Sequence, residues 1–347
     1  MLLVILGAGA TYDSDPQRPA GRITSPHRPP LTSDLFADRE GFGDFIDLYP
    51  PVRLLVPRLR AAAVDKTISI ESEFERVVAE SRDRPAVRRQ LVAAQCYIRD
   101  VVQSSTSRWA ITDAHGVTNY HRLVDEIGAW LDGGTGSVCF VTFNYDTLLE
   151  TACYDSRGMR LNEIGAYVSD MRTPVIKLHG SVNWRRPTTN LQSPHTGGGA
   201  MNAAWLMDNY AGAELSRTYE VADPFFWTQG NPVAVPAIAV PTEIKTTGDC
   251  ELPDEHLRVL REDVLPTVTN VLVIGWRGRE NHWWEMWREM RPHEVRMRVT
   301  VVDSDEGKAA EVAQYLQQQG MAQSVAHSQA SGFSDFLAGN GMAAVLQ

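Results

Sequence analysis

The stretch "FVTFNYDTLLE" at residues 140–150 joins an apolar run to a helical pattern, with Asn144 and Asp146 at the junction. The apolar run covers residues 137–143 without polar alternation, which is typical of a parallel strand buried on both faces. Ligands of open α/β sheets bind outside the carboxyl ends of the strands, so an amide and a carboxylate here favour a role in binding or catalysis. The alternative is structural, because Asn and Asp are favoured N-cap residues and Asp146 could cap the helix that follows.

Similar apolar runs occur along the chain, and helical patterns separate them. The further runs lie at residues 2–6, 174–178, 271–274 and 299–302. The helical patterns lie at residues 123–131, 147–154, 256–264, 282–290 and 306–319. Strands that alternate with helices predict an α/β protein with a Rossmann-like, doubly wound parallel sheet.

Two stretches interrupt this alternation. Residues 41–135 contain helix-like segments and no convincing core strand, which predicts an inserted helical subdomain. Residues 186–255 are rich in Pro, Gly, Asn and Thr, which predicts long loops with a short extended piece in "VAVPAIAVPTEIK" at residues 233–245. Long loops in a compact domain are often functional. We therefore expect a Rossmann-like core formed by residues 1–40, 136–185 and 256–347, with a helical insertion at 41–135 and a loop-rich insertion near the active site at 186–255.

Composition excludes several classes of function. The formal net charge of -10 argues against a broadly basic surface for DNA or RNA. Cys96, Cys139, Cys153 and Cys250 are scattered without a C-x-x-C pair, so they predict buried, reduced thiols instead of a zinc ribbon or a redox dithiol. No segment reaches the roughly 18 to 20 apolar residues that a membrane helix needs. We expect a cytoplasmic protein without membrane contact.

The segment "VILGAGAT" at residues 4–11 places Gly7 and Gly9 where the first predicted strand ends. Glycine at such a turn lets the backbone approach a phosphate closely, and the N–H groups of a following helix can bind the anion. The third glycine of the dinucleotide motif G-x-G-x-x-G is absent, because Tyr12 stands in its place. A tight turn that needs glycine only for steric reasons is the alternative.

Other predicted strand ends also carry polar groups. In "VIKLHGSVNW" at residues 175–184, His179 lies beside Gly180 and could act as a general base near neutral pH, although a lone histidine is more often structural. Later strands end in Gly275, followed by Arg277, and in Asp303, followed by Asp305. An acidic residue after a late strand suits hydrogen bonds to ribose hydroxyls, or it caps the next helix.

The segment "HWWEMW" at residues 282–287 could suggest a His/Glu metal pair or an aromatic binding stripe. Trp283, Trp284 and Trp287 have helical spacing, which is more often a sign of core packing. We therefore expect no metal site.

These motifs, in this order, resemble the sirtuin superfamily, and specifically its divergent sirtuin-like branch in bacterial antiphage defence. The similarity lies in "GAGAT" (7–11), "TFNYD" (142–146), "KLHGS" (177–181), "IGWR" (274–277) and "VVDSD" (301–305). It covers the nucleotide-binding core and not the insertions. "VPTEIK" at 240–245 also resembles a proline-threonine-lysine segment of the defence branch.

The resemblance assigns roles to individual residues. It implies that Gly7, Ala8 and Gly9 bind the NAD pyrophosphate, and that Thr11 also belongs to the cofactor-binding residues. Asn144 and Asp146 would bind the ribose on the nicotinamide side. The resemblance makes His179 the catalytic histidine, and Gly275 and Asp303 would face the adenosine half.

The chain also departs from the sirtuin deacylases. Those enzymes carry a four-cysteine zinc ribbon, which these cysteines cannot form, and an isoleucine-proline-aspartate loop where this chain has Thr11 and a Pro- and Arg-rich segment. We therefore expect an NAD hydrolase that releases nicotinamide and ADP-ribose, with NAD as its substrate and no zinc. Asn144, His179 and Asp146 are the expected catalytic residues.

The resemblance further implies an NAD-depleting defence effector that stays inactive until triggered. It makes a homo-oligomer, or a separately encoded partner such as a HerA-like ATPase or an Argonaute, the expected assembly, with no direct nucleic-acid contact. Two alternatives stay open. The same pocket could serve a protein deacylase or ADP-ribosyltransferase, or a non-catalytic module that senses NAD or ADP-ribose.

Overall fold

The computed structural model describes residues 1–20, 27–65, 68–134, 136–195, 199–223, 233–242, 251–290, 297–328 and 330–347. The chain forms two compact units, each assembled from segments that are far apart in the sequence. Unit 1 comprises Met1–Pro29, Thr106–Leu178 and Asp254–Gln347. Unit 2 comprises Pro30–Ser105 and His179–Pro253.

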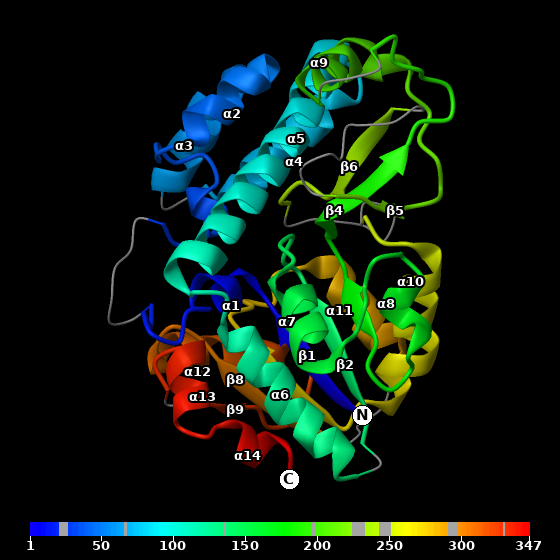
Figure 1. Ribbon diagram of the computed structural model, residues 1–347. Helices are drawn as coiled ribbons and strands as arrows, with labels where there is room; N and C mark the ends of the chain where they lie inside the picture. Colours follow the sequence, from blue (N-terminus) through cyan, green and yellow to red (C-terminus); the bar gives the residue numbers. More distant parts are fainter. Residues whose placement is uncertain are drawn as a thin grey trace. The chain divides into compact units, whose positions relative to one another are not determined.

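Unit 1 is built on a six-stranded sheet in the order β3-β2-β1-β7-β8-β9 (Figure 1). Every pairing in it is parallel. The strands are β1 (Leu2–Leu6), β2 (Val138–Thr142), β3 (Val175–Lys177), β7 (Asn270–Ile274), β8 (Arg298–Val302) and β9 (Ala326–His327). The chain builds outward from β1 in one direction and then, from β7, in the other. This order confirms the predicted Rossmann-like sheet, and its switch point lies between β1 and β7.

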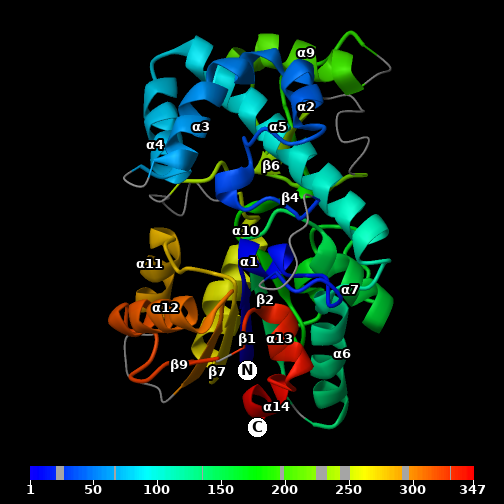
Figure 2. The same cartoon turned by 90° about the vertical axis from the view of Figure 1, so that its left-hand side faces the viewer.

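Helices cover both faces of this sheet. Figure 2 shows α11 and α12 on one side of the strands and α6, α7 and α13 on the other. The helices of unit 1 are α1 (Ala8–Tyr12), α6 (Asn119–Asp132), α7 (Leu148–Arg157), α8 (Ala166–Ser169), α10 (Asp254–Arg258), α11 (Asn281–Met290), α12 (Glu306–Gln318), α13 (Phe333–Ala338) and α14 (Met342–Val345). Shorter turns lie at Trp109–Asp113, Val259–Val264 and Leu265–Thr267.

Local sequence explains these elements. All five residues of β1 and of β2 are buried, as a continuous apolar run between two helical layers requires. In α6 the buried side chains of Leu123, Val124, Ile127 and Leu131 form one stripe, which follows the period of the helix. Helix α7 ends at Gly158, whose φ of 67° suits a glycine at a helix C-terminus.

Unit 2 combines helices with a three-stranded antiparallel sheet in the order β5-β4-β6. Its strands are β4 (Gly180–Pro187), β5 (Glu220–Val221) and β6 (Ala234–Ile238). Its helical elements are Thr32–Asp34, α2 (Phe42–Leu48), Pro50–Leu54, α3 (Val56–Val64), α4 (Ile70–Ser81), α5 (Pro85–Arg108, up to Ser105), α9 (Gly199–Asn209) and Tyr210–Gly212. Side chains of α5 reach the sheet: Gln95 Nε2 donates to the Ile238 carbonyl and Arg99 Nε to the Val182 carbonyl, each over 2.9 Å.

The two units divide the chain at other positions than the sequence suggested. Residues 106–134, expected in the helical insertion, belong to unit 1, because α6 packs its apolar stripe against α7 and α13. Residues 30–40, expected in the core, belong to unit 2, where Phe36 stacks on Tyr97 with ring centroids 4.9 Å apart. Residues 186–253 join the same unit, since β4 and β6 pair within it.

The three cysteines that the structure describes are buried and form no disulfide, as predicted. Cys96, Cys139 and Cys153 are free and buried, and burial raises the pKa of the Cys153 thiol to about 12. Cys250 lies outside the described residues, as does much of the "VPTEIK" segment. Within the part of the chain that the structure describes, no helix is long and apolar enough to cross a membrane.

Candidate functional site

The carboxyl edge of the unit 1 sheet continues as a row of backbone hydrogen bonds between the loops that leave the strands. These bonds join strands β3 to β2, β2 to β1, β1 to β7 and β7 to β8. They run from Leu178 N to Thr142 O (3.1 Å), Phe143 N to Leu6 O (3.0 Å), Gly7 N to Ile274 O (3.0 Å) and Gly275 N to Val302 O (2.9 Å). The residues that the sequence singled out after β1, β2, β7 and β8 therefore follow neighbouring positions on one edge.

Glycines at this edge pack directly against one another. The Gly9 N–H donates to the Gly275 carbonyl over 3.1 Å, and a Cβ on Gly7 would lie 2.4 Å from that same oxygen. Gly275 has a φ of +61°, and a Cβ there would lie 2.3 Å from Ala10 N. The N–H groups of Gly7 and Gly9 are thus bonded inside unit 1. Close packing of the two loops accounts for these glycines, which is the steric alternative considered from the sequence.

A buried polar cluster lies beside the glycine turn. It consists of Thr11 in α1, Tyr120 in α6, and Asn144 and Asp146 after β2, and each is at most 7% exposed. The Thr11 hydroxyl donates to Asp146 Oδ2 over 2.7 Å and lies 2.8 Å from the Tyr120 hydroxyl. Asn144 Nδ2 is 2.9 Å from the Gly7 carbonyl, 3.0 Å from Thr11 Oγ1 and 3.2 Å from the Tyr120 hydroxyl. We call these four residues the Asn144 cluster.

Asp146 also stabilises the local backbone. Its Oδ1 accepts a 3.0 Å hydrogen bond from the N–H of Leu148, the first residue of α7. Thr147 is the N-cap of α7, so Asp146 is not the capping residue that the sequence suggested as the alternative, although its bond to Leu148 N–H occupies one carboxylate oxygen. The other oxygen binds Thr11, so Asp146 connects the start of α7 to the glycine turn.

A buried ion pair supports this turn and was missed in the sequence. Lys177 in β3 is fully buried, and its ammonium group donates to the Asp146 carbonyl and, over 2.8 Å, to Glu150 Oε1. The Tyr167 hydroxyl donates to the same Glu150 oxygen over 3.2 Å. A lysine inside a short apolar strand was the available signal, since lysine is almost never fully buried without a partner.

The acidic residues after β8 have different environments. Asp305 is the N-cap of α12, and its Oδ1 accepts a 2.9 Å hydrogen bond from Lys308 N–H. Asp303 is half-buried, and its Oδ1 accepts a local 2.6 Å bond from Ser304 N–H. The capping interpretation therefore holds for Asp305. Asp303 directly follows Val302, whose carbonyl binds Gly275 N–H, so it stands next to the glycine turn.

His179 is the first residue of unit 2 and follows Leu178, the last residue of this part of unit 1. It is 7% exposed, and its carbonyl accepts a 3.0 Å hydrogen bond from Ala239 N–H. The neighbouring Gly180 has a φ of +76°, and a Cβ on it would lie 1.9 Å from the Ala237 carbonyl. Unit 1 thus brings Thr11, Asn144 and Asp146 together with Tyr120, while His179 belongs to the other unit.

The tryptophans of α11 form core, as expected. Trp283, Trp284 and Trp287 are at most 2% exposed. Trp276, which follows Gly275, stacks on Phe143 with ring centroids 4.8 Å apart. Across the described ranges, no group of three or more His, Cys, Asp or Glu side chains is placed to hold a metal ion.

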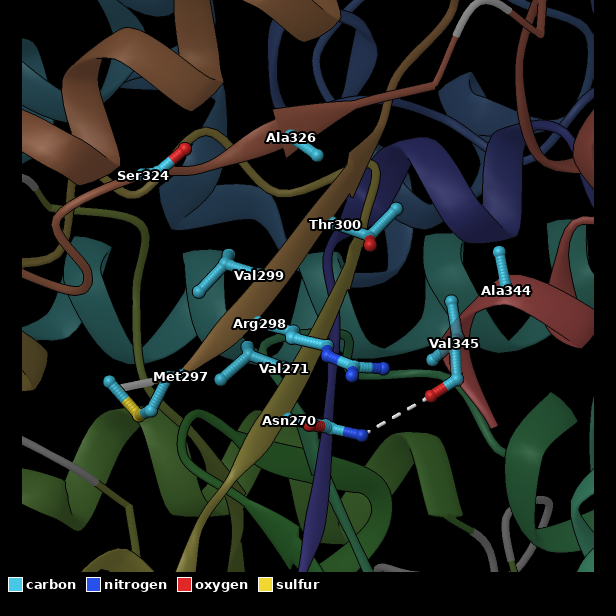
Figure 3. A pocket seen from close by; sticks show the side chains of 10 residues that line it. All are labelled: Asn270, Val271, Met297, Arg298, Val299, Thr300, Ser324, Ala326, Ala344 and Val345. Carbon is cyan, nitrogen blue, oxygen red and sulfur yellow. Dashed lines mark hydrogen bonds between the residues drawn. The ribbon is translucent and has the colours of Figure 1, made fainter. Parts of the chain in front are cut away.

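A cavity of about 420 Å³ lies at the opposite, amino ends of β7, β8 and β9, beside α14 (Figure 3). Arg298, Thr300 and several small apolar side chains line it, and Asn270 Nδ2 donates to the Val345 carbonyl over 3.3 Å at its rim. None of its lining residues belongs to the Asn144 cluster.

No model of a protein family matches this chain, and no curated protein matches it.

Proposed function

We propose that this protein is an NAD hydrolase that cleaves the bond between nicotinamide and ribose and releases nicotinamide and ADP-ribose. The observation that carries the proposal is the Asn144 cluster. It gathers an amide, a carboxylate and two hydroxyls at the carboxyl end of β1 and β2, next to the switch point where ligands of doubly wound sheets bind.

The chemistry asks for electrostatic stabilisation and oriented polar groups. Departure of nicotinamide leaves positive charge on the ribose, and an oxocarbenium-like transition state is stabilised by a nearby carboxylate and by hydrogen bonds to the ribose hydroxyls. We assign the electrostatic role to Asp146. Asn144 would orient the ribose or the attacking water. Its Nδ2 is bonded inside the cluster, and no residue that the structure describes donates a hydrogen bond to its Oδ1, so this oxygen is available to a ligand.

We assign proton transfer to His179, which would accept a proton from a ribose hydroxyl or from the attacking water. Two facts support this role. His179 lies in the motif that resembles the sirtuins, and in the chain it directly follows Leu178, whose N–H is bonded to the Thr142 carbonyl at the end of β2.

The adenosine half would lie toward Gly275 and Asp303. The loop of Gly7, Ala8, Gly9 and Thr11 would face the pyrophosphate. Because the N–H groups of Gly7 and Gly9 are bonded to Ile274 and Gly275, these two glycines would shape the floor of the site and not donate to phosphate. A role as a cytoplasmic NAD-depleting effector of antiphage defence, a homo-oligomeric state, and a HerA-like or Argonaute partner belong to the same proposal and rest on the resemblance alone.

The test is purified protein incubated with NAD, followed by chromatography for nicotinamide and ADP-ribose. We expect turnover by the wild type and a loss of about 100-fold or more in Asn144→Ala and in His179→Ala, as for removal of a group that acts in the transition state. Asp305→Ala serves as the matched control, because Asp305 caps α12, pairs with Lys308 and is not part of the Asn144 cluster.

Equal turnover by Asn144→Ala and the wild type would contradict the proposal. Tight NAD binding without turnover, unchanged in His179→Ala, would favour the sensing module. Efficient NAD-dependent deacetylation of an acetyl-peptide would favour the deacylase.

A further inference from the structure

The Asn144 cluster contains one residue to which neither the motifs nor the proposed reaction assigns a role. Tyr120 comes from α6 and is 1% exposed. Its ring packs edge-on against Phe333 of α13, with centroids 5.8 Å apart. The preceding residue, Asn119, is bonded to the Asp13 carbonyl and to Ser334, both over 2.7 Å. Tyr120 is therefore held from both sides while its hydroxyl reaches Thr11 and Asn144.

The directions of the hydrogen bonds follow from the partners. The single hydroxyl proton of Thr11 goes to Asp146 Oδ2 over 2.7 Å. In the 2.8 Å contact between Thr11 and Tyr120, Tyr120 must then be the donor, because Thr11 has no second proton to give. The Tyr120 oxygen remains free to accept from Asn144 Nδ2 at 3.2 Å. The cluster thus forms a directed chain from Asn144 through Tyr120 and Thr11 to Asp146.

This chain determines which end of the Asn144 amide faces inward. The Gly7 carbonyl can only accept, so the group 2.9 Å from it must be the NH₂. The NH₂ has two hydrogens for three acceptors, so the hydrogen that does not bind the Gly7 carbonyl is shared between the Thr11 and Tyr120 oxygens. Three acceptors around one end of the amide leave Oδ1 as the end directed away from the cluster.

We propose that Tyr120 is a positioning residue of the candidate site: together with Thr11 it orients Asn144 so that Oδ1 acts as a hydrogen-bond acceptor toward the ligand. The identity of that ligand, NAD, rests on the proposed function. Asn144 then accepts a hydrogen bond from a ribose hydroxyl or from the attacking water, and it does not donate to a carbonyl of the substrate. Burial, followed by the nearby Asp146 charge, raises the pKa of Tyr120 well above its usual value, so the phenol keeps its proton at the alkaline end of the working range.

The test compares Tyr120→Phe, Thr11→Val and the double variant with the wild type. We expect each single variant to lower kcat by about 10- to 100-fold, as for a slight misplacement of a reacting group. In Tyr120→Phe the KM for NAD should change by less than about threefold, because ground-state binding is retained. If the two hydroxyls act as one chain, the loss of kcat in the double variant should be no greater than the loss in the less active of the two single variants.

Tyr97→Phe is the matched control. Tyr97 is a fully buried tyrosine of unit 2 whose hydroxyl donates to the Leu35 carbonyl over 2.9 Å. The Tyr97→Phe variant also loses a buried hydroxyl, but this hydroxyl does not belong to the Asn144 cluster. The variant should therefore keep the wild-type kcat.

A second measurement does not depend on turnover. The side-chain amide signal of Asn144 in a nitrogen–proton correlation spectrum is identified by its absence from Asn144→Ala. Its hydrogens should exchange slowly in the wild type and faster in Tyr120→Phe.

Full kcat in Tyr120→Phe, or additive losses in the double variant, would overturn the positioning role while leaving the hydrolase intact. If the wild type does not turn over NAD, the hydrolase proposal fails, and the exchange experiment alone decides: faster exchange supports the orientation by Tyr120, and unchanged exchange overturns it.

Discussion

The Gly275 carbonyl accepts a 3.1 Å hydrogen bond from the Gly9 N–H, and a Cβ on Gly275 would lie 2.6 Å from the Gly9 Cα. The loops after β1 and β7 therefore touch at their glycines, at the switch point of the sheet. This contact joins the turn that carries Thr11 to the loop after β7. Strand β7 is the neighbour of β8, which ends just before Asp303.

Replacement of Gly275 by alanine should be far more destabilising than a comparable change elsewhere. Gly275 and Gly158 both have positive φ, +61° and +67°, but only Gly275 is crowded, while a Cβ on Gly158 meets nothing within 4 Å. Gly158→Ala should lower the free energy of unfolding by about 1 to 2 kcal/mol, the cost of the left-handed conformation. Gly275→Ala adds overpacking and should cost about 2 to 5 kcal/mol. Urea unfolding followed by circular dichroism measures both, and equal losses would show that the loops can separate freely.

Lys177 should contribute strongly to stability through Glu150. Removing one partner of a buried ion pair leaves an uncompensated charge, so Lys177→Met should lower the free energy of unfolding by about 3 to 5 kcal/mol. The double variant Lys177→Met/Glu150→Gln should recover part of this loss, because the glutamine is neutral and still accepts from Tyr167. As a control, Arg122→Met removes the exposed pair with Glu126 and should cost less than about 1 kcal/mol. Chemical unfolding of the four proteins is the measurement, and a loss no larger in Lys177→Met than in Arg122→Met would contradict the role of the pair.

His256 should make the stability of unit 1 dependent on pH. The imidazole is fully buried, and its Nε2 lies 2.8 Å from the Ile164 carbonyl. Burial lowers the pKa of His256 from its ordinary 6.5 to about 4. Below pH 6.5 His256 is protonated in the unfolded chain but stays neutral in the folded chain. The stability that is fully present above pH 6.5 is therefore lost as the pH falls toward 4.

A pKa difference of about 2.5 corresponds to about 3 kcal/mol. Between about pH 7.5 and pH 4.5 the wild type should therefore lose about 2 to 3 kcal/mol more than His256→Gln, which cannot titrate but can still donate to the carbonyl. Parallel urea titrations at the two pH values measure the difference. The same pH dependence in both proteins would show that another group is responsible.

The sheet could be predicted from the sequence because its strands are short, apolar and buried on both faces. Residues 2–6 form β1 as expected, and the run at 137–143 contains β2 with one residue trimmed at each end. Strand β4 was not recognised. It pairs with β6, which is some fifty residues away, and Gly180 is required there by the approach of Ala237, a contact that no local pattern reveals.

The candidate site was predictable only in part for a similar reason. Asn144 and Asp146 follow a recognisable strand, so the general rule for ligand positions finds them. Tyr120 lies at the start of α6, before the apolar repeat that marks the helix at 123–131, and only the tertiary structure brings its hydroxyl to Thr11. Local patterns predicted a core interrupted by insertions, but they did not give the boundaries of the two units, which depend on contacts between segments separated by many residues.

Two carboxylates at the end of β8, those of Asp303 and Asp305, have separable roles in ligand binding and helix capping. Asp305 accepts from Lys308 N–H as the N-cap of α12, so Asp305→Ala should lower the midpoint of urea unfolding and leave the affinity for ADP-ribose unchanged. Asp303 has a half-buried carboxylate next to the glycine turn, and we propose that it binds the adenosine ribose. Asp303→Ala should therefore weaken ADP-ribose binding by about tenfold or more, the usual effect of losing hydrogen bonds to a charged group. Calorimetric titration of both variants with ADP-ribose makes the comparison, and an affinity reduced only in Asp305→Ala would reverse the assignment of the two residues.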